Sequence, residues 1–544
     1  MSRPNAATSP ARGWWIAAWA LCLTGAVLRI GAYALHRSLW YDEAALALNI
    51  AERGFLALLA PLDHLQAAPP LFLWAQRALV LLFGPSEWTL RALPLGAAIV
   101  TLPLTWRVGR RLLSERPAVL AVALVALSPT LVRYAAEAKP YATDALLTLV
   151  LMDRAVAAAE PNASPRAWWI LAAVGVVALL ASTPAVFVLA GCVAFLAAAA
   201  ARAPAGRSGS VIRRTALVAA GWAAAFAILL ATVFRPLLGG SSAIGKYMHW
   251  YWSANFLTPD PPGLKVKILA LLWGVLPGTF FGESPIRKAT SLMVLAIAIG
   301  LVALVATRRW ATILSLTVPN IALVGASALR RYPIAERLVL FAAPLSAMLV
   351  AASLMPLDRL RSRRVANWLA AGVTAAVAVL AALGLITWRS SPIGHQESRS
   401  LVRVAARAHA EGTPVWVSGG GEAVWRYYTG TRPRVRDAGG VTADSSVGGR
   451  AFSPDLLLGE WYALVPERIR EMPEDTAGTA KPSAWSEREA GRVRAIAKPC
   501  ALVFLTHTMP GERAALFTSI AQQGGRVADS RRDVGAELNR VCFG

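Results

Sequence analysis

The sequence is poor in charged residues and in cysteine. Charged side chains make up 16% of its 544 residues, whereas hydrophobic ones make up 56%. Soluble domains do not carry repeated apolar runs of about 20 residues. The four cysteines are too few for a disulfide framework. The composition therefore excludes an ordinary soluble domain and a small disulfide scaffold, and it predicts a polytopic α-helical membrane protein.

The few cysteines fall into two groups. Cys22 and Cys192 lie inside apolar segments, where they are expected to be packing residues. Cys500 and Cys542 lie in the polar C-terminal region, on stretches with the pattern of strands. Two interpretations of this second pair stay open: a disulfide, if the region is extracytoplasmic, or two buried thiols.

Acidic residues are also scarce, and the formal net charge is +24. In a soluble chain this excess would suggest nucleic acid. Here the arginines cluster between apolar segments, which is typical of cytoplasmic loops. The clusters lie at residues 107–116, 202–214, 308–309 and 359–364.

These clusters predict about eleven transmembrane helices, with a cytoplasmic N-terminus and an extracytoplasmic C-terminus. Two further apolar stretches, residues 69–83 and 264–281, would reverse the orientation if they crossed the membrane, so they are expected to be interfacial. The predicted spans are residues 14–34, 91–108, 118–133, 141–158, 167–183, 184–201, 215–237, 289–307, 311–329, 336–355 and 366–388.

Long apolar runs end near Ser391, so we predict a membrane domain at residues 1–391 and an extracytoplasmic domain at residues 392–544. The second domain alternates predicted strands and helices, which favours a small α/β fold. A turn at residues 419–421 lacks the spacing of a phosphate loop. The predicted strands are residues 414–418, 501–505 and one near the end, and the predicted helices are residues 422–428 and 511–523.

Trp40-Tyr41-Asp42-Glu43 places two carboxylates just beyond the first apolar segment. Carboxylates are costly beside lipid unless they have a function. The alternative is a helix start, in which Asp42 caps and Glu43 favours the positive end. The rest of the chain favours catalysis over capping.

Two later segments bring polar groups to the same predicted face, at residues 133–141 and 330–337. Arginines can hold a phosphate by paired hydrogen bonds, and a carboxylate can accept the proton of an attacking hydroxyl. The alternatives are interfacial anchors for the cations and an aromatic belt for the tyrosines. His64 has no second ligand at metal spacing, and His507 is expected to be structural. No metal or cofactor is predicted, although a divalent metal is not excluded.

Five motifs, in this order and topology, resemble bacterial membrane glycosyltransferases of the GT-C superfold. The nearest relatives are the protein O-mannosyltransferases and the aminoarabinose transferases of lipid A modification, which are glycosyltransferase family 39-like. The motifs are Trp40-Tyr41-Asp42-Glu43, Gln66-Ala67-Ala68-Pro69-Pro70-Leu71-Phe72, Phe83-Gly84-Pro85-Ser86-Glu87 with Arg91, Glu137-Ala138-Lys139-Pro140-Tyr141, and Tyr332-Pro333 with Glu336-Arg337-Leu338.

The resemblance implies an inverting transfer of a sugar from a polyprenyl-phosphate donor to a hydroxyl of an extracytoplasmic lipid, glycan or protein, at the bacterial inner membrane. It implies that Asp42 is the base, with Glu43 beside it. Glu137 would orient the acceptor or help to keep Asp42 ionised. The donor and acceptor site would comprise His64, Arg133, Lys139, Tyr141, Arg331, Tyr332 and Arg337.

Two departures from the family affect the donor headgroup. Ala67-Ala68 stand where the family often has histidine or lysine before Pro-Pro; either His64 replaces that group or the contact is missing. Lys139 stands where arginine is commoner, which gives up a bidentate phosphate contact.

Two rival functions come from other classes. A lipid-linked sugar transporter or flippase would be expected to show inverted repeats and polar residues near the middle of the membrane. No repeat is evident, and the charges gather at one face. A non-catalytic membrane subunit would leave Asp42 and Glu137 without a role.

Overall fold

The computed structural model divides the chain into two compact units. The first comprises Met1–His36 with Arg53–Ser391, and the second comprises Arg37–Glu52 with Pro392–Gly544. A single cut at residue 391 does not give this division, because the segment around the acidic pair groups with the C-terminal region. The structure describes residues 12–234, 245, 249, 251–260, 262–281, 289–390, 396–430, 456–459, 484–508 and 511–544.

All eleven predicted spans are helical over their described residues, in the first unit; residues 235–237 of the span predicted at 215–237 lie outside the described residues. In the described part of the chain, six helices are long and apolar enough to cross a membrane, which makes this a multi-pass membrane protein. The count of eleven crossings stays a prediction. The corresponding helices are α1 (Arg12–Ala34), α4 (Glu87–Leu112), α5 (Glu115–Leu127) with α6 (Pro129–Tyr134), α7 (Tyr141–Ala159), α8 (Pro165–Ala181), α9 (Ala185–Ala201), α10 (Ala205–Leu229), α15 (Ala289–Ala306), α16 (Trp310–Ala328), η5 (Glu336–Ala342) with α17 (Ala343–Ala351) and η6 (Ala352–Arg359), and α18 (Arg363–Ser390).

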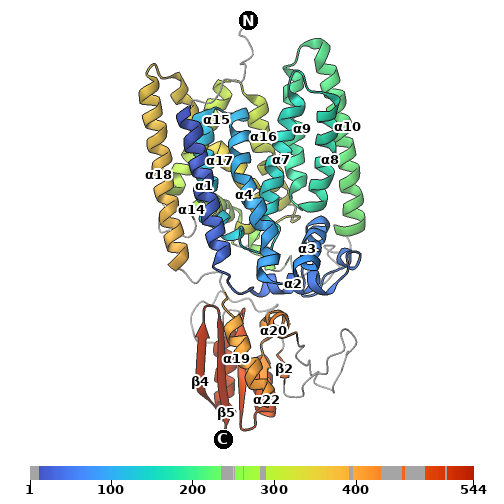
Figure 1. Ribbon diagram of the computed structural model, residues 1–544, viewed down its shortest axis with the longest axis vertical. Coiled ribbons are helices and arrows are strands. Elements are labelled where there is room, and N and C mark those ends of the chain that lie inside the picture. Colours follow the sequence, from blue (N-terminus) through green and yellow to red (C-terminus); the bar gives the residue numbers. More distant parts are fainter. Residues whose placement is uncertain are drawn as a thin grey trace. The chain divides into compact units, whose positions relative to one another are not determined.

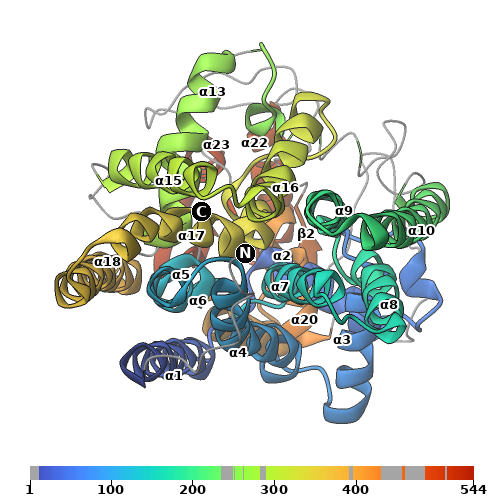
Figure 2. The same cartoon turned by 90° about the horizontal axis from the view of Figure 1, so that it is seen from above.

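The first unit is built around α5, whose residues from Arg116 to Leu127 are all buried. Helices α1, α4, α17 and α18 surround it, and α8, α9 and α10 form a group to one side (Figures 1 and 2). Helix α9 packs closely on α16 at Gly191. A side chain there would not fit, since a Cβ on Gly191 would lie 2.6 Å from the Cγ of Pro319. The buried apolar side chains of the first unit form one core among these helices, with α5 at its centre.

The span predicted at residues 118–133 is broken between α5 and α6. Pro129 has no N–H to donate to the carbonyl of Val125, so this helix cannot continue with its usual hydrogen bonds. The buried Arg29 of α1 donates instead to the carbonyl oxygens of Val125 and Ala126, each at 2.9 Å. Gly25 permits this approach, since a Cβ there would lie 2.8 Å from the Cβ of Ala126.

Both stretches expected to be interfacial are also helical. Helix α3 (Pro70–Phe83) begins with proline at its first position and ends at Gly84, whose φ is +80°. The second stretch forms α13 (Leu264–Ala270), a π-helical turn (Leu271–Val275) and α14 (Leu276–Phe281). Ser128 and Thr130 donate to carbonyls of α14 at 2.5 Å and 2.8 Å. Helix α14 therefore lies beside α6. Shorter elements are η1 (Ala57–Leu59), η2 (Leu230–Phe234) and η3 (Ser253–Asn255).

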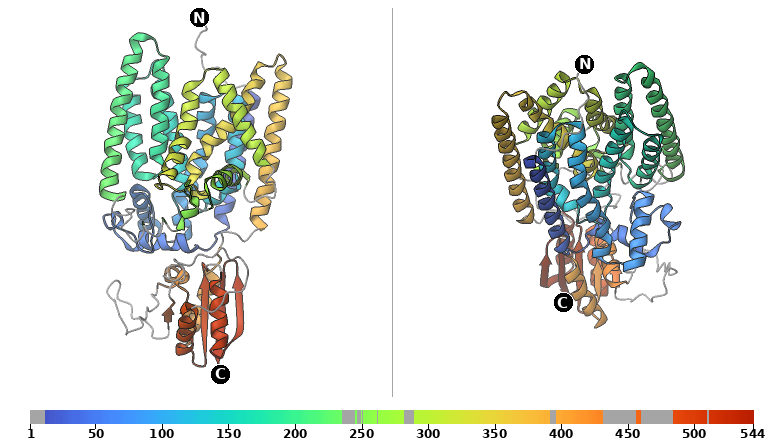
Figure 3. Two further views of the ribbon diagram at one scale, coloured as in Figure 1. Left: turned by 180° about the vertical axis from the view of Figure 1, so that it is seen from behind. Right: turned by 45° about the horizontal axis from the view of Figure 1, so that its top comes forward.

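The second unit is an α/β domain with one five-stranded sheet in the order β2-β1-β3-β5-β4 (Figure 3). Strand β1 runs parallel to β2 and β3, whereas β5 runs antiparallel to β3 and β4. The predicted α/β fold is confirmed, and the strand expected near the end is a pair of strands. The elements are α2 (Tyr41–Glu52), α19 (Arg399–Ala410), β1 (Val415–Val417), η7 (Gly419–Gly421), α20 (Glu422–Thr429), β2 (Leu456–Leu458), α22 (Ala484–Ile496), β3 (Cys500–Thr506), α23 (Glu512–Gln522), β4 (Gly525–Asp533) and β5 (Ala536–Phe543).

Cys500 and Cys542 form a disulfide. They are directly paired residues of the neighbouring antiparallel strands β3 and β5, with their Cα atoms 3.9 Å apart. Of the two interpretations that the sequence leaves open, the structure therefore has the disulfide. Cys22 and Cys192 are buried free thiols, as expected for packing residues.

Candidate functional site

The acidic pair lies in the first turn of α2, in the second unit. The carbonyl of Trp40 accepts the first helical hydrogen bond, from the amide of Ala44 at 2.9 Å, so Trp40 occupies the N-cap position. Asp42 is the second residue of the helix and is half-buried, while Glu43 is 1% exposed. Acidic side chains in the first turn interact favourably with the positive end of a helix.

Residues from two distant segments of the first unit lie around Arg133 of α6. Its Nε lies 3.4 Å from the Oε1 of the buried Glu137. Arg133 also interacts electrostatically with Glu336 and Arg337, about 200 positions further along the chain. Thr130 completes this side with a hydroxyl 3.4 Å from the Oε1 of Glu336.

Lys139 is buried on the other side of the same loop. Its Nζ donates to the Oε1 of Gln66 at 2.8 Å, and the Nε2 of Gln66 donates to the carbonyl of His64 at 3.2 Å. His64 is itself half-buried, with a left-handed φ of 58°. The segment before Pro69-Pro70 and the Glu-x-Lys-Pro-Tyr motif therefore pack together, as the shared predicted face requires. We call Arg133, Glu137, Lys139, Glu336 and Arg337 the polar cluster.

Aromatic rings line this region. Tyr134 and Tyr141 meet edge to face, with ring centroids 5.3 Å apart. The guanidinium of Arg133 lies over the Tyr134 ring at 5.1 Å, and that of Arg337 lies over the Trp252 ring at 5.3 Å. Cations held over aromatic faces are restrained, which suits recognition of an anion.

Tyr332 links the cluster to the first turn of α7. Its hydroxyl donates to the carbonyl of Leu338 at 3.0 Å, and its ring meets Phe187 edge to face. Burial raises the pKa of Tyr332 well above its usual range, and the nearby Asp144 and Tyr141 raise it further. The hydroxyl is therefore neutral and acts as a donor.

The structure does not bring all predicted site residues into the cluster. Arg331 is exposed, and its neighbour Arg330 forms an ion pair with Asp260 at the surface. Asp42 and Glu43 belong to the second unit, so the prediction that Asp42 shares one cavity with Glu137 and Arg337 stays a prediction. Within the first unit, Glu137 and Arg337 do meet around Arg133.

Sequence reasoning missed two residues of this region. Asp144 is buried in the first turn of α7, near Ser182. A carboxylate inside an apolar helix is a signal that could have found it. Trp252 carries no such signal, because only the folded chain places its ring against Arg337.

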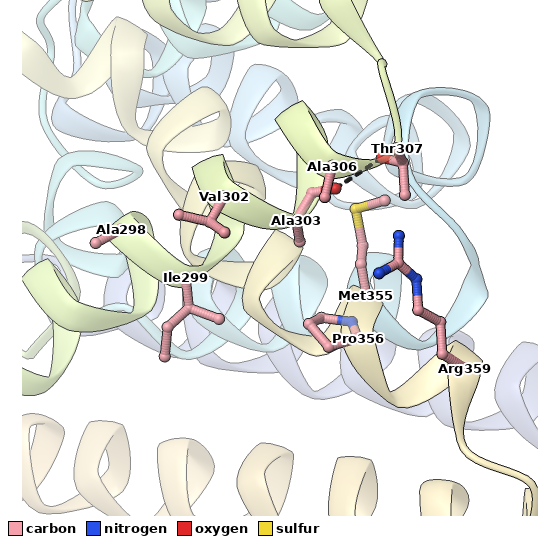
Figure 4. A pocket seen from close by; sticks show the side chains of 9 residues that line it. All are labelled: Ala298, Ile299, Val302, Ala303, Ala306, Thr307, Met355, Pro356 and Arg359. Carbon is pink, nitrogen blue, oxygen red and sulfur yellow. Dashed lines mark hydrogen bonds between the residues drawn. The ribbon is translucent and has the colours of Figure 1, made fainter.

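Groups of metal ligands and cavities are two further kinds of candidate site. Within the described residues, no group of three or more His, Cys, Asp or Glu side chains could hold a metal ion. An apolar groove of about 310 Å³ lies between α15 and η6, with Arg359 and Thr307 at its end (Figure 4). None of the predicted site residues lines it.

Comparisons with known proteins agree with this architecture. The family model of dolichyl-phosphate-mannose-protein mannosyltransferases matches residues 67–230, which include Arg133, Glu137 and Lys139. No curated protein matches the chain in sequence.

Two solved structures of ArnT match over nearly the whole chain. ArnT from Cupriavidus metallidurans bound to undecaprenyl phosphate is 13% identical, with 97% of this chain and 98% of that chain covered and a TM-score of 0.54. Its apo structure is 15% identical, with 98% of each chain covered and a TM-score of 0.51. AglB from Archaeoglobus fulgidus, with an inhibitory peptide and a dolichol-phosphate, is 12% identical, with 78% and 65% covered and a TM-score of 0.48. The chain has the fold of ArnT.

Proposed function

We propose that this protein is an integral membrane glycosyltransferase that moves a sugar from a polyprenyl-phosphate donor to an extracytoplasmic hydroxyl, with inversion. The observation that carries the proposal is the polar cluster at one end of a GT-C fold, with Glu137 and Lys139 buried. Two arginines, a lysine and two glutamates form this cluster, and three of the five residues lie in the segment that the family model matches. The undecaprenyl phosphate bound by ArnT supports the donor class.

The proposed chemistry uses one base and several cations. As the acceptor oxygen attacks the anomeric carbon, Asp42 takes the hydroxyl proton and the bond from that carbon to the phosphate oxygen breaks. The polyprenyl phosphate leaves with the bonding electrons, and Arg337 stabilises its charge. A phosphate leaves without the acid that a glycosidase supplies.

The remaining site residues have supporting roles in the proposal. Glu137 orients the acceptor or keeps Asp42 ionised through a shared cation. Lys139, Arg133 and Arg331 add positive charge for the donor, while Tyr141 and Tyr332 border the sugar. Glu43 lies beside the base, and His64 stands in for the family's group before Pro-Pro.

The membrane domain at residues 1–391 would carry the reaction. The domain at residues 392–544 would lie outside the cytoplasm of a bacterial inner membrane, where a disulfide between Cys500 and Cys542 is stable. We infer that the acceptor is a lipid, glycan or protein in the cell envelope, and that the transferred group is a hexose or pentose.

The decisive experiment is transfer by purified protein in nanodiscs with a labelled polyprenyl-phosphate sugar. Asp42→Asn should abolish transfer while the protein still inserts and folds, because an amide cannot accept the proton. The control is Asp529→Asn, an exposed aspartate of the same unit whose side chain is 61% exposed.

The outcomes separate the candidate functions. Asparagine has nearly the size and shape of aspartate but is a far weaker base, so near-full activity of Asp42→Asn would overturn the base assignment. Movement of the donor between leaflets without transfer would identify a flippase instead. Mass spectrometry of envelope glycans from a deletion strain and wild type would then identify the sugar and acceptor.

A further inference from the structure

Side chains of the C-terminal domain hold the residues that lead into α2. The amide of Ser38 donates to the Oε2 of Glu397 at 3.1 Å, and the Ser38 hydroxyl donates to the same oxygen at 2.9 Å. The amide of Leu39 donates to the hydroxyl of Tyr428 at 2.8 Å. These amides precede the helix and have no partner within it.

The strongest restraint is on Tyr41, the residue before Asp42. Its amide donates to the Oε1 of Gln396 at 3.1 Å, and its ring stacks on His507 with centroids 4.8 Å apart and planes 11° apart. Gln396 and His507 are joined in turn, with the Nε2 of Gln396 3.0 Å from the Nδ1 of His507. The backbone of Tyr41 is thus held by Gln396 and its ring by His507, and these two residues contact each other.

His507 is set for this contact by the end of β3. Its φ is +51°, a left-handed conformation that non-glycine residues rarely adopt and that persists only where the surroundings enforce it. The neighbouring η7 packs against it, since a Cβ on Gly420 would lie 2.8 Å from the His507 carbonyl oxygen. This histidine, expected to be merely structural, is therefore presented to Tyr41 by the sheet.

The far end of α2 is held as well. Glu52, its last residue, forms an ion pair with Arg426 of α20, whose side chain is 8% exposed. A helix of 12 residues restrained at both ends has little freedom to rotate or shift. The carboxylates of its first turn are fixed with it.

We propose that the C-terminal domain positions the acidic pair for catalysis, and that His507 and Gln396 are its positioning residues. The inference rests on the proposed function only in taking Asp42 as the base. A base must lie within hydrogen-bond reach of the proton that it accepts, and a displacement of about 1 Å can cost roughly 100-fold in rate. Loosening Tyr41 moves the next residue, Asp42, without removing any group that touches substrate.

The experiment uses the full chain in nanodiscs and measures transfer kinetics and hydrogen exchange of residues 38–46. Gln396→Ala removes the acceptor for the Tyr41 amide. It should speed exchange in that segment and lower kcat by about 10-fold or more, with the donor KM within about twofold of wild type. His507→Ala should do the same.

Three further variants sharpen the test. Gln396→Glu keeps an acceptor for the Tyr41 amide and should restore exchange and kcat to within about threefold of wild type. His507→Phe keeps the stacked ring and should lie between His507→Ala and wild type. Thr518→Ala removes an exposed hydroxyl that bonds only within α23, and should match wild type in both measurements.

The results are decisive in either direction. Unchanged exchange in Gln396→Ala and His507→Ala would overturn the proposal. So would faster exchange with an unchanged kcat, or a loss confined to the donor KM. If the wild type transfers no sugar, the proposed function fails, and the exchange data still decide separately whether the C-terminal domain restrains α2.

Discussion

The two ends of the helical unit use arginine in different ways. At the arginine-rich end, Arg107 and Arg111 bind the buried carboxylate of Asp153 at 2.8 Å and 2.7 Å, which ties α4 to α7. Arg116 of α5 pairs with Asp358 of η6. Arg309 donates to the carbonyls that end α4, where a helix leaves its acceptors unsatisfied.

At the other end, the polar cluster holds cations near each other. Arg133 is repelled by Arg337, but it is attracted more strongly by Glu137 and Glu336. Lys139 donates to the Oε1 of Gln66. Helix α7 has 19 residues and separates the two ends by about 28 Å. One end therefore uses its charges to join helices, while the other gathers three cations and two carboxylates from distant segments. Cations gathered in this way can bind an anionic ligand.

The largest expected effect concerns which end of the helical unit faces the cytoplasm, as measured with reporter fusions. The arginine-rich loops predict that residue 544 lies outside the cytoplasm, so alkaline phosphatase fused there should be active and green fluorescent protein dark. Fusions after residue 204, in a predicted inside loop, should give the opposite pattern. Active alkaline phosphatase at residue 204 only would put the polar cluster on the cytoplasmic face and remove the extracytoplasmic acceptor.

Arg337→Lys should lower kcat/KM for the donor by about 10- to 100-fold, because an ammonium cannot reproduce the guanidinium fork on a phosphate. The lysine side chain would keep part of the packing that Arg337 makes over the Trp252 ring. The matched control is Arg110→Lys at the arginine-rich end, where Arg110 lies over Trp106 at 5.1 Å. Equal losses in both variants would show that the comparison between the ends is wrong.

Asp153→Asn should act on stability rather than on transfer. The Asp153 side chain is 4% exposed and accepts hydrogen bonds from three arginines, so the substitution removes the buried charge that joins α4 to α7. The arginines are partly exposed and remain hydrated, so the expected cost is about 1–2 kcal/mol, measured as a lower midpoint of thermal unfolding in nanodiscs. Activity per folded molecule should be unchanged; a selective loss of activity would assign this end a catalytic role.

Lys139→Arg should have the smallest effect. It installs the residue that is commoner in the family and can keep the contact with Gln66 while adding a second donor. We expect the donor KM to fall by at most about threefold at constant kcat, as measured in the transfer assay. A tenfold rise in KM would mean that the buried lysine has no room for a guanidinium and does not face the donor.

Much of the fold was predictable from local patterns. Apolar runs long enough to cross a bilayer predict helices because their backbone groups must bond internally, and all eleven such segments are helical over their described residues. The alternation of strand and helix patterns after residue 391 predicted the α/β domain, because these patterns are also local properties of the sequence. The break at Ser128-Pro129 was not predicted, although proline carries the signal, because the apolar run continues through it.

The grouping of site residues was predictable only in part. Short motifs indicated Glu137, Lys139 and Arg337, since charged residues at the ends of apolar helices stand out in a sequence. Their contacts with Gln66 and Trp252 could not be predicted, because each joins segments more than 70 residues apart. Nor could the placement of α2 with the C-terminal domain, which depends on His507 and Gln396, more than 350 residues further along the chain.

The sequence by itself determined a multi-pass helical protein, its C-terminal α/β domain and the candidate residues, because hydropathy, strand patterns and charged motifs are local properties. Only the tertiary structure decided which charges are neutralised between helices, which remain clustered, and which domain holds the acidic pair. Those outcomes depend on packing and on ion pairs between distant segments, whose free energies no local pattern contains.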